Sequence, residues 1–239
     1  MKFAAVFLIL AIGGAFSQLR GQAALGTDSG PSTSAPAAAP RWYGRIDGDT
    51  YVSPTGLYRV KIPVLPQLGA IIDDTPNVVT FDDAYSVHVT IGAFPFSPEL
   101  KAEYETRGSK EFLISFFTSI IMPDFAANFP GSTMEPAAAF LPKVQDGSVL
   151  IFNLIPGGSN FEQRTRFSSA IKPVVAKRGN LCFVKSGYVF IISTELAERA
   201  FERSTYKRTT EEENAILRQR LLDLAAKMQV TPVQAAPKN

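Results

Sequence analysis

The sequence has very few side chains suited to metal binding, redox chemistry or nucleophilic catalysis. Among its 239 residues there is one cysteine, Cys182, and one histidine, His88. A single thiol cannot form an intramolecular disulfide, and a structural zinc site needs about four nitrogen or sulfur ligands. We therefore expect a fold held together by its hydrophobic core, with no cofactor.

The chain also has no large excess of either charge. It carries 24 Lys and Arg against 22 Asp and Glu, a formal charge of +2. A protein dedicated to nucleic acid normally has a marked basic excess. We therefore expect no nucleic-acid partner.

Several catalytic and modification motifs are missing as well. There is no N-x-[ST] sequon and no G-x-S-x-G motif. The segment Gly157–Asn160 follows an apolar run but lacks the GK[ST] ending of a phosphate-binding loop. We expect no capped helix after it and interpret it as a turn.

The first residues have the three-part layout of a secretory signal peptide. Met1-Lys2 is a short positive start, Phe3–Ile12 is apolar, and Ala15-Phe16-Ser17 offers small residues for cleavage. Extended to Phe16, the apolar stretch has about 14 residues and gives roughly 21 Å of helix, less than the ~30 Å hydrocarbon core of a bilayer. We expect residues 1–17 to be a cleaved signal peptide, with an uncleaved anchor as the alternative. The mature protein would then be periplasmic or extracellular, with no integral membrane span.

The remaining chain divides by composition. Residues 18–41 are rich in Pro, Ser, Gly and Ala and have little to bury, so we expect a linker. Residues 42–233 contain no comparable break and are expected to form one domain. Residues 234–239 are expected to be a disordered tail.

Strands and then helices are predicted in the first half of this domain. Apolar and polar residues alternate in Leu57–Ile62, and the runs Val78–Phe81 and Ser86–Phe94 also fit strands. Ser97 before Pro98 is typical of a helix start. A second start at Ser109 leads into the uncharged run Phe112–Met122, which we expect to be a buried helix ended by Pro123.

The second half returns to strands. We predict four, at Val149–Ile155, Phe161–Phe167, Asn180–Val184 and Tyr188–Ser193, with a hairpin turn at Ser186-Gly187. A capping box beginning at Thr210 then predicts a final helix with the apolar stripe Leu217, Leu221, Leu224 and Met228. The order βββ-α-ββββ-α indicates an α+β fold, a mainly antiparallel sheet packed by helices in an α/β/α sandwich.

Three segments resemble the PsbP-like family of exported α/β/α sandwich proteins. They are Ser53–Pro63, Ser86–Ile91 and Gly187–Glu195, within a resemblance that covers most of Tyr51–Val230. The resemblance implies a binding or assembly-accessory role without catalysis. Plant members serve photosystem II and some relatives bind metal, but one histidine gives little basis for a metal site, and no functional residue is transferred.

Four groups of residues were considered for chemistry. His88 could act as a general base, but no triad spacing accompanies it, and a surface or hydrogen-bonded histidine is the alternative. Cys182 alternates with apolar residues, which favours a buried thiol over a catalytic one. The acidic pairs Asp73-Asp74 and Asp82-Asp83 could hold a hard cation, although their spacing matches no calcium loop.

The last group is a basic stretch. From Gln163 to Thr194 there is no acidic residue. If the strands are neighbours, their outward faces form a positive patch that could contact an anionic envelope surface; alternatively, Glu195, Glu198, Glu202 and Glu211–Glu213 neutralise it nearby. The basic residues are Arg164, Arg166, Lys172, Lys177, Arg178 and Lys185.

These observations leave three functional hypotheses. The first is an exported non-catalytic binding or assembly-accessory protein, whose partner is an unknown protein or an anionic envelope component. The second is a carrier of a small apolar ligand, based on the uncharged run Phe112–Met122 and the 18 Phe. The third is a hydrolase that uses Ser or Asp groups without a recognisable motif.

Overall fold

The computed structural model describes residues 43–136, 138–165 and 173–232, with the side chains of residues 163–165 excepted. The expected signal peptide, linker and tail lie outside the described residues. So do Arg166 and Lys172 of the basic stretch, and the side chain of Arg164.

Twelve strands and six α-helices are described, with short 3₁₀ turns at Pro66–Leu68 and Arg203–Thr205. The strands are β1 (Arg45–Asp47), β2 (Thr50–Val52), β3 (Tyr58–Lys61), β4 (Ile71–Asp74), β5 (Val78–Asp82), β6 (His88–Pro95), β7 (Thr133–Met134), β8 (Ala139–Leu141), β9 (Ser148–Pro156), β10 (Val175–Lys185), β11 (Tyr188–Glu195) and β12 (Met228–Val230). The helices are α1 (Pro98–Arg107), α2 (Ser109–Phe116), α3 (Met122–Asn128), α4 (Asn160–Thr165), α5 (Glu198–Glu202) and α6 (Thr210–Ala226).

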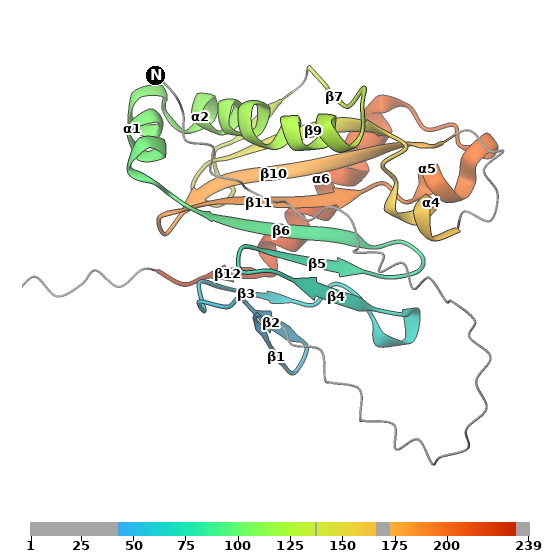
Figure 1. The fold of residues 1–239 in the computed structure, drawn as a ribbon, viewed down its shortest axis with the longest axis horizontal. Coiled ribbons are helices and arrows are strands. Elements are labelled where there is room, and N and C mark those ends of the chain that lie inside the picture. The colour runs from blue at the N-terminus through green and yellow to red at the C-terminus, as the bar shows by residue number, and fades with distance from the viewer. Residues whose placement is uncertain (1–42, 137, 166–172, 233–239) are drawn as a thin grey trace, which may run out of the picture. The chain divides into compact units, whose positions relative to one another are not determined.

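The strands form two antiparallel sheets (Figure 1). The larger has the order β4-β5-β6-β11-β10-β9-β7, with β8 also paired to β9, and the smaller has the order β1-β2-β3-β12. Hairpins connect most neighbours, as in the turn between β10 and β11, where Ser186 and Gly187 both have positive φ. The α+β class with an antiparallel sheet packed by helices is confirmed.

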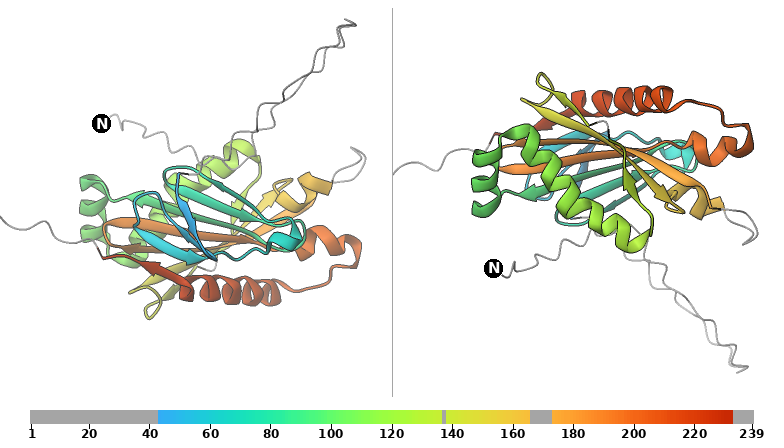
Figure 2. Two further views of the ribbon diagram at one scale, coloured as in Figure 1. Left: turned by 90° about the horizontal axis from the view of Figure 1, so that it is seen from below. Right: turned by 90° about the horizontal axis from the view of Figure 1, so that it is seen from above.

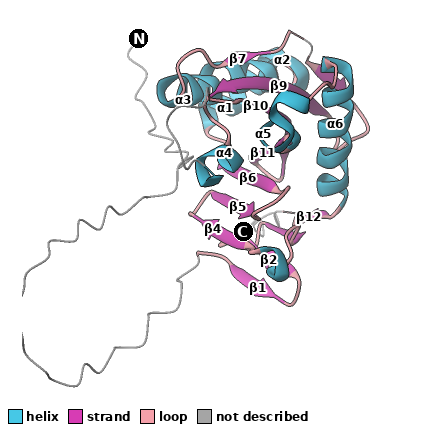
Figure 3. Ribbon diagram, turned by 90° about the vertical axis from the view of Figure 1, so that its right-hand side faces the viewer, coloured by secondary structure: helices cyan, strands magenta, loops and turns pink. Residues whose placement is uncertain are grey.

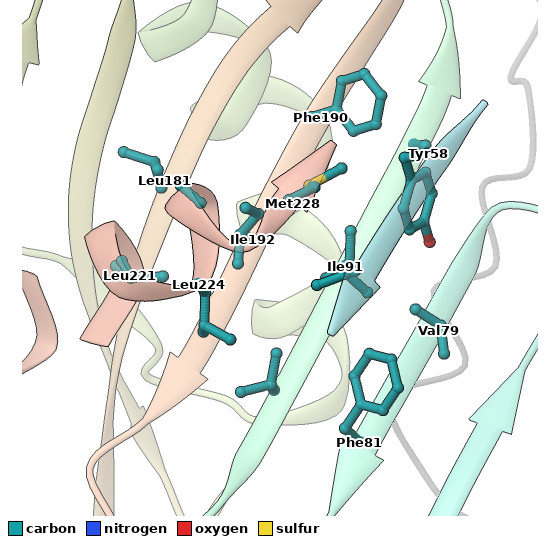
Figure 4. Close-up of a cluster of buried hydrophobic side chains, with 14 of the residues drawn as sticks. Tyr58, Val79, Phe81, Ile91, Leu181, Phe190, Ile192, Leu221, Leu224 and Met228 are labelled. Atoms are coloured by element: carbon teal, nitrogen blue, oxygen red, sulfur yellow. The ribbon is translucent and has the colours of Figure 1, made fainter. Parts of the chain in front are cut away.

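Helices lie on both faces of the large sheet. Helix α6 runs along one face, and α1, α2 and α3 lie on the other (Figures 2 and 3). The small sheet lies on the same side as α6, beside β4, β5 and β6. A large core fills the space between the large sheet, α6 and the small sheet, with Phe81, Ile91, Phe190 and Leu221 fully buried (Figure 4).

A glycine on β10 allows α6 to approach closely. A Cβ added to Gly179 would lie 3.0 Å from both Leu217 Cβ and Leu221 Cδ1. Such a distance is shorter than ordinary van der Waals contact, so a larger side chain here would push the helix away from the sheet. Three of the predicted stripe residues, Leu217, Leu221 and Leu224, are buried on this face, whereas Met228 lies on β12.

Most predicted elements are present, but two boundaries were wrong. The uncharged helix does not end at Pro123, because the chain forms a π-helical turn at Phe117–Ile121 and continues as α3 to Asn128. The wider turn changes the hydrogen-bond pattern just before the proline, which has no N–H to donate. The final capping box uses Thr209 and Glu212, one residue earlier than predicted.

The predicted strand Phe161–Phe167 was also wrong. Residues 160–165 form helix α4, and the N–H of Glu162 donates to Oγ of Ser159 at 3.3 Å. Ser159 therefore caps a helix directly after Gly157-Gly158, which corrects the expectation that no capped helix follows this segment.

Candidate functional site

The basic stretch does not form a continuous outward patch. Lys177 and Arg178 are 0% and 2% exposed, so neither cation faces solvent. Lys185 is half-buried, with Nζ 3.2 Å from Asp146 Oδ2. The two buried cations are paired with Glu213 and Glu195, as the alternative interpretation of neutralisation by nearby glutamates predicted.

Arg178 belongs to a row of polar side chains across one end of the large sheet, on the face that carries α3. Strand register places Arg178 opposite both Glu195 and Asn153, and Asp82 opposite His88. The pairing of Thr194 with Val89 places Glu195 next to His88. Five strands thus bring acidic, basic, amide and imidazole groups to one place, which we call the polar row: Asp82, His88, Glu195, Arg178 and Asn153.

His88 is held from two sides. Its Nδ1 lies 2.6 Å from Asp82 Oδ1, and its Nε2 lies 2.7 Å from the side-chain nitrogen of Asn160. The tautomer with the proton on Nδ1 satisfies both contacts, because Nε2 then accepts from the amide. His88 is 4% exposed, so the prediction of a hydrogen-bonded histidine is confirmed and that of a surface one is wrong.

Glu195 anchors the start of α4 to the sheet. Its Oε1 accepts from Ser159 Oγ at 2.6 Å, and its Oε2 accepts from the backbone N–H of Asn160 at 3.2 Å. The guanidinium of Arg178 lies 3.5 Å from Oε2 and 3.3 Å from the carbonyl oxygen of Gly158. Burial lowers the pKa of Arg178, while the charges of Glu195 and Asp82 oppose this shift.

The start of α4 could have been detected in the sequence. Ser159-Asn160-Phe161-Glu162 has the S-x-x-E pattern typical of a helix start. The alternation of Phe161, Thr165 and Phe167 with charged residues favoured a strand instead. The capping pattern was the more reliable signal here.

Lys177 lies in a second ionic network on the opposite face of the same sheet. Its Nζ lies 2.7 Å from Glu135 Oε1 and 3.1 Å from Glu213 Oε2. Glu213 also accepts two hydrogen bonds from Arg199, at 2.6 and 2.8 Å, and one from Tyr206 at 2.6 Å. Burial opposes ionisation of Glu213, but the hydrogen bonds from these three partners outweigh it and lower its pKa.

Of the remaining candidates, Cys182, Asp74 and Asp83 have structural roles, whereas Asp73 is exposed on β4. Cys182 is fully buried, and burial raises the pKa of its thiol far above the usual value. Asp74 accepts hydrogen bonds from the backbone of Tyr43 and Gly44 and from the hydroxyl of Tyr51. Asp83 accepts from three consecutive backbone N–H groups, at residues 85–87. Within the described ranges, no group of three or more His, Cys, Asp or Glu has an arrangement suited to a metal ion.

The uncharged helical run packs through aromatic rings. Phe112 lies with its ring centroid 5.5 Å from that of Phe96 and 5.4 Å from that of Tyr104, both in edge-to-face geometry. These contacts explain its burial without a ligand. The carrier hypothesis stays a prediction. In the described part of the chain, no helix combines the length and apolar character needed to cross a bilayer.

Comparisons with known proteins give only distant structural likeness. No family model matches the sequence, and no curated protein matches it.

The Ran-binding protein Mog1p of Saccharomyces cerevisiae has a TM-score of 0.46 at 9% identity, over 80% of this chain and 97% of Mog1p. A Bacteroides thetaiotaomicron protein has a TM-score of 0.40 at 9% identity, over 79% of this chain and 50% of that one. PsbP of the cyanobacterium Synechocystis has a TM-score of 0.38 at 12% identity, over 84% of this chain and all of that one. All three scores lie below 0.5, so these likenesses carry no argument about this chain, and the PsbP-like resemblance stays a prediction from the sequence.

Proposed function

We propose that this protein is an exported, non-catalytic binding or assembly-accessory protein, which acts through its surface on an anionic component of the cell envelope. Export rests on the expected signal peptide at residues 1–17. The binding role rests on how the described side chains are used.

One observation carries the proposal: the side chains best suited to catalysis are occupied in holding the fold together. The imidazole of His88 is buried between Asp82 and Asn160, within 2.6 and 2.7 Å of them. The hydroxyl of Ser159 is buried and bonded to Glu195 at 2.6 Å. A nucleophile or general base must reach substrate, and His88 and Ser159 are only 4% and 1% exposed.

The architecture suits a rigid scaffold. Two antiparallel sheets share one core with α6, and the buried charges fix the ends of strands and helices. Such an arrangement holds its outer strands in a defined register. A partner would therefore meet preformed surfaces rather than a closing site.

The first test is a turnover screen with ester, peptide and phosphomonoester substrates. The exported chain is compared with His88→Gln, Ser159→Ala and Cys182→Ala variants whose folding is confirmed by circular dichroism. We expect hydrolysis rates equal to those of buffer for every protein. Turnover of any substrate by the wild-type chain would overturn the proposal, and the variants would then identify the residue responsible.

The second test is fractionation of cells that export the chain. The proposal predicts that the chain is recovered with the cell envelope and is released from it by high salt, because charge attracts it to an anionic component. Recovery of the chain only in the fraction free of envelope would contradict the proposal.

A further inference from the structure

The small sheet has one face in the core and another that is mostly exposed, although Val52 on this second face is only 2% exposed. Tyr51, Tyr58, Val60 and Met228 point into the core. The register then places the intervening residues on the opposite side in two cross-strand rows. We call this the outer face; its rows are Arg45, Val52, Arg59 and Gln229, and Asp47, Thr50 and Lys61, with Lys227 beside Lys61.

The outer face contains a hollow of about 290 Å³. Three cationic residues line it, Arg59, Lys61 and Lys227, and none of the carboxylates in the described part of the chain does. Thr50 and Gln229 add a hydroxyl and an amide that can donate hydrogen bonds. The remaining lining residue, Val60, belongs to the strand between them.

The cations of the hollow are only weakly engaged. Arg59 lies 3.2 Å from Asp47 and Lys61 lies 2.9 Å from Asp49, and all four side chains are about half exposed or more. Exposed ion pairs contribute about 0–1 kcal/mol, so these cations exchange partners readily. Lys227 forms no ion pair with any residue that the structure describes.

The end of α6 does not oppose an anion in this hollow. A helix C-terminus is the negative end of the helix dipole, and Lys227 follows it directly. The last carbonyl oxygens are engaged, however: Ala225 accepts from Gln145 Nε2, Leu224 from the Lys227 N–H, and Lys227 from the Lys61 N–H. The lysine side chains therefore dominate the local charge.

We propose that the outer face binds the phosphate group of an anionic phospholipid headgroup in this hollow. The planar guanidinium group of Arg59 can donate hydrogen bonds to two phosphate oxygens at once, and the ammonium groups of Lys61 and Lys227 add positive charge beside it. Arg45 adds a fourth positive charge to the same face. This inference rests on the proposed function and names the anionic component that the protein contacts.

The test is flotation of the exported chain with vesicles of phosphatidylcholine and phosphatidylglycerol in about a two-to-one ratio, against phosphatidylcholine alone. We expect binding only to the mixed vesicles, weakening as salt is raised. A Lys61→Gln/Lys227→Gln variant should bind about thirtyfold more weakly, since each basic residue near an anionic bilayer contributes roughly fivefold. The matched control is Lys101→Gln/Lys110→Gln, two exposed lysines of α1 and α2, which should change binding less than about twofold.

A second arm distinguishes the source of the phosphate. Inorganic phosphate and glycerol 3-phosphate are titrated into the protein by calorimetry. Binding of either with no vesicle binding overturns the lipid assignment, because the site then takes soluble phosphate. If both double variants bind the mixed vesicles equally well, the hollow is not the binding site. If the protein binds neither vesicles nor soluble phosphates, the whole inference is overturned. None of these results affects the proposed function, which fails only on substrate turnover or on the absence of salt-sensitive recovery with the cell envelope.

Discussion

Lys177 and Arg178 are adjacent on β10, yet their charges are buried on opposite faces of the same sheet. Lys177 lies against Glu213 of α6, and Arg178 lies against Glu195 of β11. Successive residues of a strand point to opposite sides, so one dipeptide connects the sheet to both neighbouring layers. These two cations are thus structural elements of the fold and cannot form a partner-binding patch.

Removing the charge of Lys177 should destabilise the protein strongly. In Lys177→Met the ammonium that lies 5.6 Å from the ring centroid of Phe152 is removed, and Glu135 and Glu213 lose their shared cation. Breaking a buried ion pair in this way costs about 3 kcal/mol or more, whereas Lys185→Met, at a half-exposed pair on the same strand, should cost less than about 1 kcal/mol. Urea unfolding measures both. Equal losses would mean that Lys177 is not buried as described.

Substituting Glu195 should loosen α4 before it affects the rest of the fold. In the wild-type protein, Oε2 of Glu195 accepts hydrogen bonds from both Arg178 and the backbone N–H of Asn160. In Glu195→Gln an NH₂ group, which cannot accept, replaces this oxygen. Amide exchange at residues 160–165 should become about thirtyfold faster, in line with about 2 kcal/mol for an unsatisfied buried group. Hydrogen exchange read by mass spectrometry measures this. A Glu105→Gln variant on α1 is the control, and unchanged protection of α4 would argue against the anchoring role.

Glu213 should contribute to the loss of stability in acid. Its pKa is lower than the usual 4.5 in the folded protein, so the folded state holds this proton less tightly than the unfolded state does. The contribution of ionised Glu213 to the free energy of unfolding is therefore complete above pH 4.5. It is lost as the pH falls through the pKa of Glu213 in the folded protein. Glu213→Gln should be less stable at neutral pH by about 3 kcal/mol and should lack this part of the acid dependence. Urea midpoints measured across this range test it, and parallel pH curves for the two proteins would contradict it.

Tyr206 should titrate late in the alkaline range. Burial and the nearby carboxylate of Glu213 raise its pKa from 10.0 to about 12. Because the pKa is raised, the stability that the protonated Tyr206 hydroxyl contributes is fully present below pH 10. It is lost as the pH rises toward about 12. Ultraviolet difference titration should show one late-ionising tyrosine missing in Tyr206→Phe. The same ionisation should move to lower pH in Glu213→Gln, and no movement would show that the two groups do not interact.

Local patterns in the sequence predicted the parts of the fold that depend on neighbouring residues. Alternation gave β3 and β6, Ser97-Pro98 gave the start of α1, and Ser186-Gly187 gave the turn between β10 and β11. Each of these signals acts over a few residues. The short strand β12 was missed because its three residues follow a helix and pair with β3, far away in the chain.

The candidate site could not be predicted in the same way. The partners of Lys177 are Glu135 and Glu213, which lie about 40 residues before it and about 36 after it. A single sequence does not show which distant carboxylate will pair with a basic residue. The basic residues of β10 were therefore interpreted as part of an exposed positive patch. His88 was ambiguous for the same reason, since Asn160 reaches it only through the anchoring of α4.

The protein thus uses its charges in two ways: the buried cations of β10 hold the core, and the exposed cations of the outer face are available to bind. Lysine acylation of the native protein, followed residue by residue with mass spectrometry, tests both parts at once. The account predicts rapid labelling of Lys61 and Lys227, protection of both by phosphatidylglycerol vesicles, and no labelling of Lys177 until the protein is unfolded. Labelling of Lys177 in the folded protein, or no protection of Lys61 and Lys227 by the vesicles, would contradict it.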